Sequence, residues 1–130
     1  MQVAVYTYHH PSSPSQPVLT KLHSYRAQSE PIDISVYENI IAVGDMMKGT
    51  SLLEWDSKKN RLSEVARNYK TQWVTAVALL DRETVVSADA EGNVLVQEWE
   101  VNGVTAGDQR KLQVTGEMRI GEMVNRFRRG

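Results

Sequence analysis

Three histidines are the residues of this chain best suited by type to metal binding or proton transfer. His9 and His10 are adjacent in a stretch rich in proline and serine, where neighbouring side chains diverge, and the 130-residue sequence has no cysteine to complete a metal site. His23 has no nucleophile spaced around it and lies in a stretch that favours an ordinary polar residue on a strand. The sequence therefore predicts no metal, no catalytic base and no cofactor.

Asp45 and Asp89 could act as a carboxylate pair in acid–base catalysis. They occupy the same place in a repeated pattern, however, 44 positions apart (89−45), so we expect each to form a turn in its own repeat. The segment 44–49 contains two glycines and a lysine, but its spacing is not that of a phosphate-binding P-loop and no long helix follows. These residues predict turns, and nothing in the chain predicts an enzyme.

The composition of the chain argues against nucleic acid and membranes as direct partners. The 15 basic and 16 acidic residues give a net charge of −1, so the chain has no overall basic field for nucleic acid. The cluster of Arg126, Arg128 and Arg129 predicts a solvent-facing strand end. The lack of cysteine suits an intracellular protein, and no apolar run approaches the length of a membrane span. We expect a globular protein without membrane contact.

Short segments rich in β-branched residues, separated by turn residues, predict an all-β chain. Residues 3–8 alternate as a half-buried strand would, and a loop rich in proline and serine follows them up to Pro17. Two sets of four strands are then expected, at 32–37, 40–43, 50–55 and 62–69, and at 73–80, 84–88, 93–99 and 111–120. By propensity alone, residues 62–69 could also form one or two helical turns.

The two sets of strands are repeats of one unit. Superposing them places the following pairs 44 positions apart: Asp45 and Asp89 (89−45), Leu52 and Val96 (96−52), and Trp55 and Trp99 (99−55). Four strands in a period of this length are typical of propeller blades. In the clearest unit, 87–99, Asp89 is expected to close a turn in which Gly92 takes a positive φ, as in a WD-type repeat.

The fold class predicted is therefore a partial WD-type β-propeller of about two blades. We expect the last strand of a preceding blade and a loop at 1–30, a first blade at 31–72, a second blade at 73–120 and the first strand of a next blade at 121–130. A closed ring needs roughly four to eight blades, so two blades leave apolar faces bare. We expect a piece of a longer protein or a truncated gene model, poorly soluble by itself.

The segments 41–48, 65–69, 73–77, 88–93 and 120–125 together resemble a family of large propeller proteins. That family comprises the larger subunit of the UV-damaged-DNA-binding complex, a splicing-factor 3b subunit and the cleavage-and-polyadenylation factor A subunit. The runs Gly-Asp-Met-Met-Lys at 44–48 and Gly-Glu-Met-Val-Asn at 121–125 look most like the damage-binding branch.

The resemblance implies a non-enzymatic piece of the third, carboxy-terminal propeller of a nuclear ubiquitin-ligase adaptor that acts in DNA repair. Substrate-receptor proteins would bind this propeller through a short helix, a cullin would bind a propeller absent from this chain, and DNA would be reached through a receptor subunit. The alternative is a scaffold of an mRNA cleavage and polyadenylation or splicing complex.

The resemblance also implies an apolar pocket for the receptor helix. Carried over position by position, its residues fall on Ile32, Ile34, Ser35, Met46, Trp73, Met123 and Asn125. Ser35 departs from the pattern, because the damage-binding branch tends to have an aromatic residue there. The other six suit the anchors of an amphipathic helix, with Asn125 available to bond an exposed backbone group.

Overall fold

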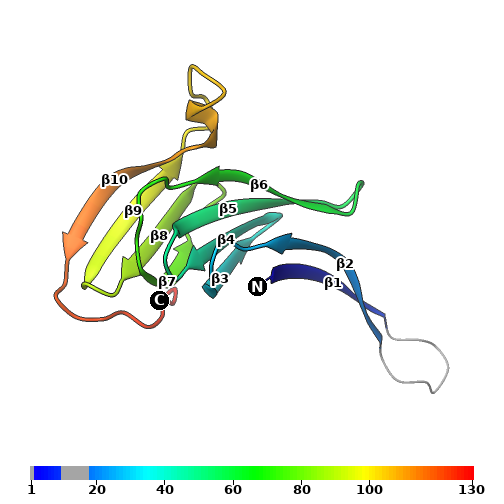
Figure 1. The fold of residues 1–130 in the computed structure, drawn as a ribbon, viewed down its shortest axis with the longest axis horizontal. Coiled ribbons are helices and arrows are strands. Elements are labelled where there is room, and N and C mark those ends of the chain that lie inside the picture. The colour runs from blue at the N-terminus through cyan, green and yellow to red at the C-terminus, as the bar shows by residue number, and fades with distance from the viewer. Residues whose placement is uncertain (1, 10–17) are drawn as a thin grey trace.

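The computed structural model describes residues 2–9 and 18–130, and β-strands make up most of that part of the chain (Figure 1). Strands β1 (Gln2–His9) and β2 (Val18–Arg26) pair into a two-stranded hairpin. The predicted loop between them, with His10, lies outside the described residues. The described ranges contain one short 3₁₀ turn, η1 (Asp108–Arg110), and no helix long and apolar enough to cross a membrane.

Two four-stranded antiparallel sheets follow, and each takes its strands in chain order. Sheet 1 contains β3 (Pro31–Tyr37), β4 (Ile40–Asp45), β5 (Gly49–Asp56) and β6 (Arg61–Arg67). Sheet 2 contains β7 (Val74–Leu79), β8 (Thr84–Asp89), β9 (Asn93–Trp99) and β10 (Leu112–Arg119). The eight predicted strands are confirmed to within two residues at each end. The helical alternative for 62–69 is wrong, because β6 pairs with β5 along its length.

The repeated aspartates form the turns that follow β4 and β8. Asp89 Oδ1 accepts hydrogen bonds from the backbone N–H of Glu91 at 2.9 Å and of Asn93 at 3.0 Å, and Gly92 between them has a φ of 85°. Asp45 accepts equivalent bonds in the first repeat. Burial alone would raise the pKa of both carboxyls. Hydrogen bonds outweigh it and hold each pKa below its usual value; at Asp45 the side chain and N–H of Ser29 contribute most, and at Asp89 the bonds from Asn93 do. The predicted turn-forming role is confirmed.

Two apolar clusters hold the three sheets in one stack. One cluster lies between the hairpin and sheet 1 and contains Val3, Ile41, Val43, Leu53 and Leu62. The other lies between sheets 1 and 2 and includes Ile40, Ala42, Leu52, Val74, Val77, Leu79 and Val85. Successive residues of β4 point alternately into the two clusters, so β4 is buried along its whole length. Sheet 1 is thus covered on both faces.

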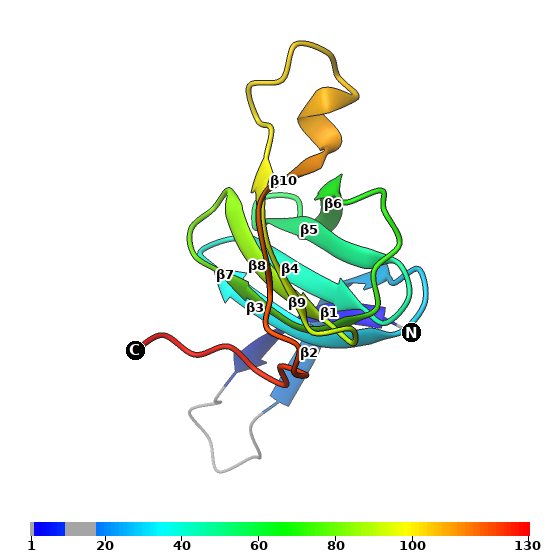
Figure 2. The same ribbon diagram turned by 90° about the vertical axis from the view of Figure 1, so that its left-hand side faces the viewer.

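Side chains of β3 also bond directly to the backbone of β7, which lies beside it in the same stack (Figure 2). Asp33 Oδ2 accepts from the N–H of Val77 at 3.1 Å, and Ser35 Oγ accepts from the N–H of Leu79 at 2.9 Å. Each pair is 44 positions apart, so the sequence period is also the spacing of the contact between the sheets.

The segment 121–130, predicted as the first strand of a next blade, is irregular in the structure. The segment runs back toward β7, where Thr75 Oγ1 donates to the carbonyl of Val124 at 2.7 Å (Figures 1 and 2). Arg129 donates to the carbonyl of Leu79 at 3.3 Å and also to that of Leu80. A strand requires a ladder of backbone bonds, whereas these contacts are made by side chains.

Candidate functional site

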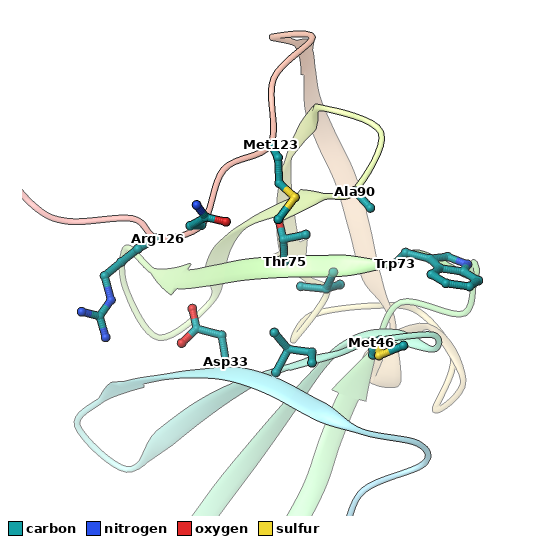
Figure 3. A pocket seen from close by; sticks show the side chains of 10 residues that line it. Asp33, Met46, Trp73, Thr75, Ala90, Met123 and Arg126 are labelled. Carbon is teal, nitrogen blue, oxygen red and sulfur yellow. The ribbon is translucent and has the colours of Figure 1, made fainter.

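A hollow of about 500 Å³ opens where the first residues of β3 and β7 meet the irregular C-terminal segment. Trp73 lies at one end of it in Figure 3, and Asp33 and Arg126 lie at the other. Its lining consists of Ile32, Asp33, Met46, Trp73, Val74, Thr75, Ala90, Met123, Asn125 and Arg126. The hollow therefore draws on both sheets and on the C-terminal segment.

The turns of the two sheets position its apolar end. The N–H of Met46, in the turn after β4, donates to the carbonyl of Glu30 at 2.7 Å. Trp73 directly precedes β7, and its carbonyl accepts from the N–H of Ala90 at 2.9 Å, which ties it to the turn after β8. The Trp73 side chain is 53% exposed, so it stands at the mouth of the hollow and is available to a partner.

The C-terminal segment forms the opposite wall. Its start is fixed by the carbonyl of Gly92, which accepts from the N–H of Ile120 at 2.8 Å and of Gly121 at 3.2 Å. The bond from Thr75 to Val124 then holds the residues on either side, and Met123 points into the hollow toward Thr75 (Figure 3). These backbone contacts give Met123 a defined place although it lies outside any strand.

The lining combines apolar walls with few polar groups. Asp33 uses one oxygen for Val77 and accepts from the N–H of Ile34 with the other at 3.0 Å, so its carboxylate is engaged in the fold. Over residues 2–9 and 18–130, no group of three or more His, Cys, Asp or Glu side chains is placed to hold a metal ion. The hollow is therefore suited to burying apolar side chains of a partner and to hydrogen bonding at Asn125 and Arg126.

Five of the seven residues predicted for the pocket line this hollow: Ile32, Met46, Trp73, Met123 and Asn125. Ile34 is exposed on the face of β3 that also carries Ile32, but it lies outside the lining of the hollow. Alternation along β3 turns Ser35 toward β7, where it bonds Leu79 and lines a smaller hollow of about 300 Å³ with Phe127 and Arg129.

The sequence prediction did not include Asp33, Val74, Thr75, Ala90 and Arg126, which complete the lining. Four of them are sequence neighbours of predicted residues: Asp33 follows Ile32, Val74 and Thr75 follow Trp73, and Arg126 follows Asn125. Adjacency was therefore the signal that could have identified them. Ala90 carries no such signal, because only the packing of the turn after β8 against Trp73 places it there.

A further group of titratable side chains joins the hairpin to sheet 1. His23 lies on β2, as predicted, and its Nδ1 accepts from the N–H of Leu62 at 2.9 Å. Tyr25 donates to Glu64 at 2.6 Å, and burial, together with this bond and the charge of Glu64, raises the pKa of Tyr25 to about 12. Arg67 donates to the other oxygen of Glu64, so the carboxylate is paired. These contacts stabilise the stack of sheets.

Two four-stranded antiparallel sheets in the same strand order, with a WD-type aspartate turn in each, define the chain as part of a β-propeller with sheets 1 and 2 as two of its blades. The predicted fold class is confirmed. A sequence model of the family described as "CPSF A subunit region" matches residues 2–130. The chain belongs to this family, which confirms the resemblance.

The curated relatives that match this chain include DNA damage-binding proteins. DNA damage-binding protein 1a of Arabidopsis thaliana is 38% identical over 92 residues, which cover 71% of this chain and 8% of that relative. DNA damage-binding protein 1 of Oryza sativa subsp. japonica is 36% identical over 92 residues, with the same coverage of 71% and 8%. DNA damage-binding protein 1 of Schizosaccharomyces pombe is 30% identical over 106 residues, which cover 82% of this chain and 10% of that relative. The chain thus spans about a tenth or less of these proteins.

Proposed function

We propose that the chain is a non-enzymatic protein-interaction scaffold within a damage-binding type of adaptor that serves a cullin-RING ubiquitin ligase in DNA repair. The names of the relatives support the connection with damaged DNA. In this proposal the adaptor works in the nucleus, the cullin binds a propeller outside this chain, and DNA is reached indirectly through a receptor subunit.

The exposed Trp73 at the mouth of the hollow is the observation that carries this proposal. A half-exposed tryptophan beside a concave apolar surface offers contact area that is well suited to anchoring a partner. A short amphipathic helix of a substrate receptor would place its apolar side chains against Trp73, Met46 and Met123. Asn125 would bond the free backbone groups at the helix end. Ile34, exposed farther along β3, would extend the contact.

Substitution of Trp73 by alanine in the full-length protein tests this function. We expect receptor binding to weaken by about 2 kcal/mol or more, roughly thirtyfold, as is usual when an aromatic anchor is removed. The affinity for the cullin and the melting temperature should stay unchanged, because the side chain is 53% exposed. Tyr69→Ala is the matched control, since Tyr69 is 64% exposed and lies outside the hollow.

Calorimetric titration with both partners and a thermal melt on the same sample would distinguish the two roles of Trp73. A lower melting temperature with equal loss of receptor and cullin affinity would show that Trp73 only packs the fold.

The family's description as CPSF A subunit region favours a second candidate, a scaffold of an mRNA cleavage and polyadenylation or splicing complex. Affinity purification of the full-length protein separates the two candidates. Recovery of a cullin supports the ligase adaptor, and recovery of RNA-processing subunits in its place supports the scaffold on pre-mRNA.

A further inference from the structure

The end of the hollow opposite Trp73 carries a cation that the fold leaves unused. Arg126 lines the hollow, is exposed, and makes no ion pair or hydrogen bond with any residue of the described ranges 2–9 and 18–130. Its guanidinium keeps all five N–H donors, which match the two oxygens of a carboxylate.

Asp33, the carboxylate at the same end of the hollow, forms no ion pair with Arg126 among the described residues. Asp33 accepts from the backbone of Ile34 and Val77, so both its oxygens are engaged. Thr75 donates to the carbonyl of Val124, which fixes the backbone two residues before Arg126. The hollow therefore has an apolar end at Trp73 and a polar end at which, among the described residues, the donors of Arg126 are free, and this arrangement gives it a direction (Figure 3).

We propose that Arg126 selects partner helices in which an acidic side chain follows or precedes the apolar anchors, so that its carboxylate meets the guanidinium when the anchors contact Trp73. This inference rests on the proposed function of the hollow. A peptide is favoured over a nucleic acid because, among the described residues, the lining offers one free cation and mainly apolar surface, whereas nucleic-acid sites gather several cations along a phosphate backbone.

The probes are three fluorescein-labelled amphipathic helical peptides with the same leucine anchors and Glu, Gln or Lys at the position that faces Arg126. Their affinities for the full-length protein would be measured by fluorescence anisotropy in low salt. We expect the Glu peptide to bind about fivefold more tightly than the Gln peptide, as for a partly exposed ion pair, and the Lys peptide to bind most weakly. In 1 M salt the differences should shrink.

Charge reversal at Arg126 provides the decisive comparison. Arg126→Glu should invert the order so that the Lys peptide binds best, and the milder Arg126→Gln should remove the preference. Arg119→Glu is the matched control, because it changes the net charge equally at the end of β10 and Arg119 does not line the hollow. The control should keep the wild-type order.

The outcomes separate this inference from the function on which it rests. If Trp73→Ala weakens all three peptides but the Arg126 variants keep the wild-type order, the selectivity is refuted and the helix-binding hollow stands. If Trp73→Ala changes none of the affinities, both the charge selectivity of Arg126 and the helix-binding function of the hollow are refuted. If Arg126→Gln weakens binding of a single-stranded oligonucleotide and leaves the peptide order unchanged, the cation serves nucleic acid and the proposal is overturned.

Discussion

Gly44 lies on β4 against Val74 and Val77 of β7, so Gly44→Ala tests how tightly the blades pack. A Cβ built at this position would lie 2.6 Å from Val74 Cγ1 and 2.9 Å from Val77 Cγ1. Carbon atoms prefer a separation of roughly 3.5–4.0 Å, so the methyl group would force the two sheets apart or push both valines out of place.

The expected loss follows from two opposing effects. Overpacking of this kind costs about 1–3 kcal/mol. Replacing glycine by alanine also restricts the unfolded chain, which offsets about 0.4–1 kcal/mol. We expect a net loss of about 1–2 kcal/mol in the free energy of unfolding, measured by urea denaturation followed through tryptophan fluorescence.

Gly116→Ala is the control, because a Cβ there meets only Val96, at 3.6 Å and 3.7 Å, which is ordinary contact. It should be neutral or slightly stabilising. Val74→Ala removes the nearest methyl, so combining it with Gly44→Ala should destabilise less than the sum of the two single variants. If Gly44→Ala is as stable as Gly116→Ala, or if the double variant is simply additive, the account of close packing between the blades is wrong.

Two further predictions concern the turns and the C-terminal segment. Because the pKa of Asp89 is lowered in the folded protein, the unfolded chain binds more protons, and the stabilisation by Asp89 should be present at neutral pH and fall away as the pH drops below about 4. The difference in unfolding free energy between wild type and Asp89→Asn should therefore shrink between pH 7 and pH 3, and a constant difference would contradict this. Arg129→Ala should release the end of the chain from the carbonyls of Leu79 and Leu80, so limited trypsin digestion should cleave after Arg126 sooner than in wild type. Unchanged digestion kinetics would show that these bonds do not hold the segment.

The strands of sheets 1 and 2 could be predicted because local chemistry specifies their ends. Asp89 and Gly92 specify one turn by side-chain hydrogen bonding and positive φ, and Asp45 marks its equivalent one period earlier. The alternation of β-branched residues then gives the strands between the turns. These signals act over a few residues, which is why sequence alone was sufficient.

Two features of the chain depended on partners distant in sequence. The segment 121–130 was predicted to begin a next blade, but its backbone meets the side chain of Thr75 instead of a neighbouring strand, so no ladder forms. Strand β2 was predicted only as the strand that carries His23 and without bounds, since its mostly exposed, polar sequence shows little alternation and its pairing with β1 defines it. Strand propensity describes how well a residue fits a sheet and cannot supply the neighbour that makes one.

The candidate pocket shows the same division. Trp73, Met46 and Met123 could be placed together because the family resemblance carries the positions of its pocket onto them. Ser35 faces β7 by alternation along β3, but its bond to the Leu79 N–H depends on the packing of sheets 1 and 2, which no local pattern encodes.

The two faces of β4 have a consequence for cooperativity. Its residues pack against the hairpin on one side and sheet 2 on the other, so sheet 1 is the shared member of both apolar clusters. A row of units coupled through nearest neighbours behaves like a one-dimensional Ising chain, in which each interface adds its own stabilisation. In such a chain the hairpin can detach while the boundary between the blades, and the hollow built on it, remains closed.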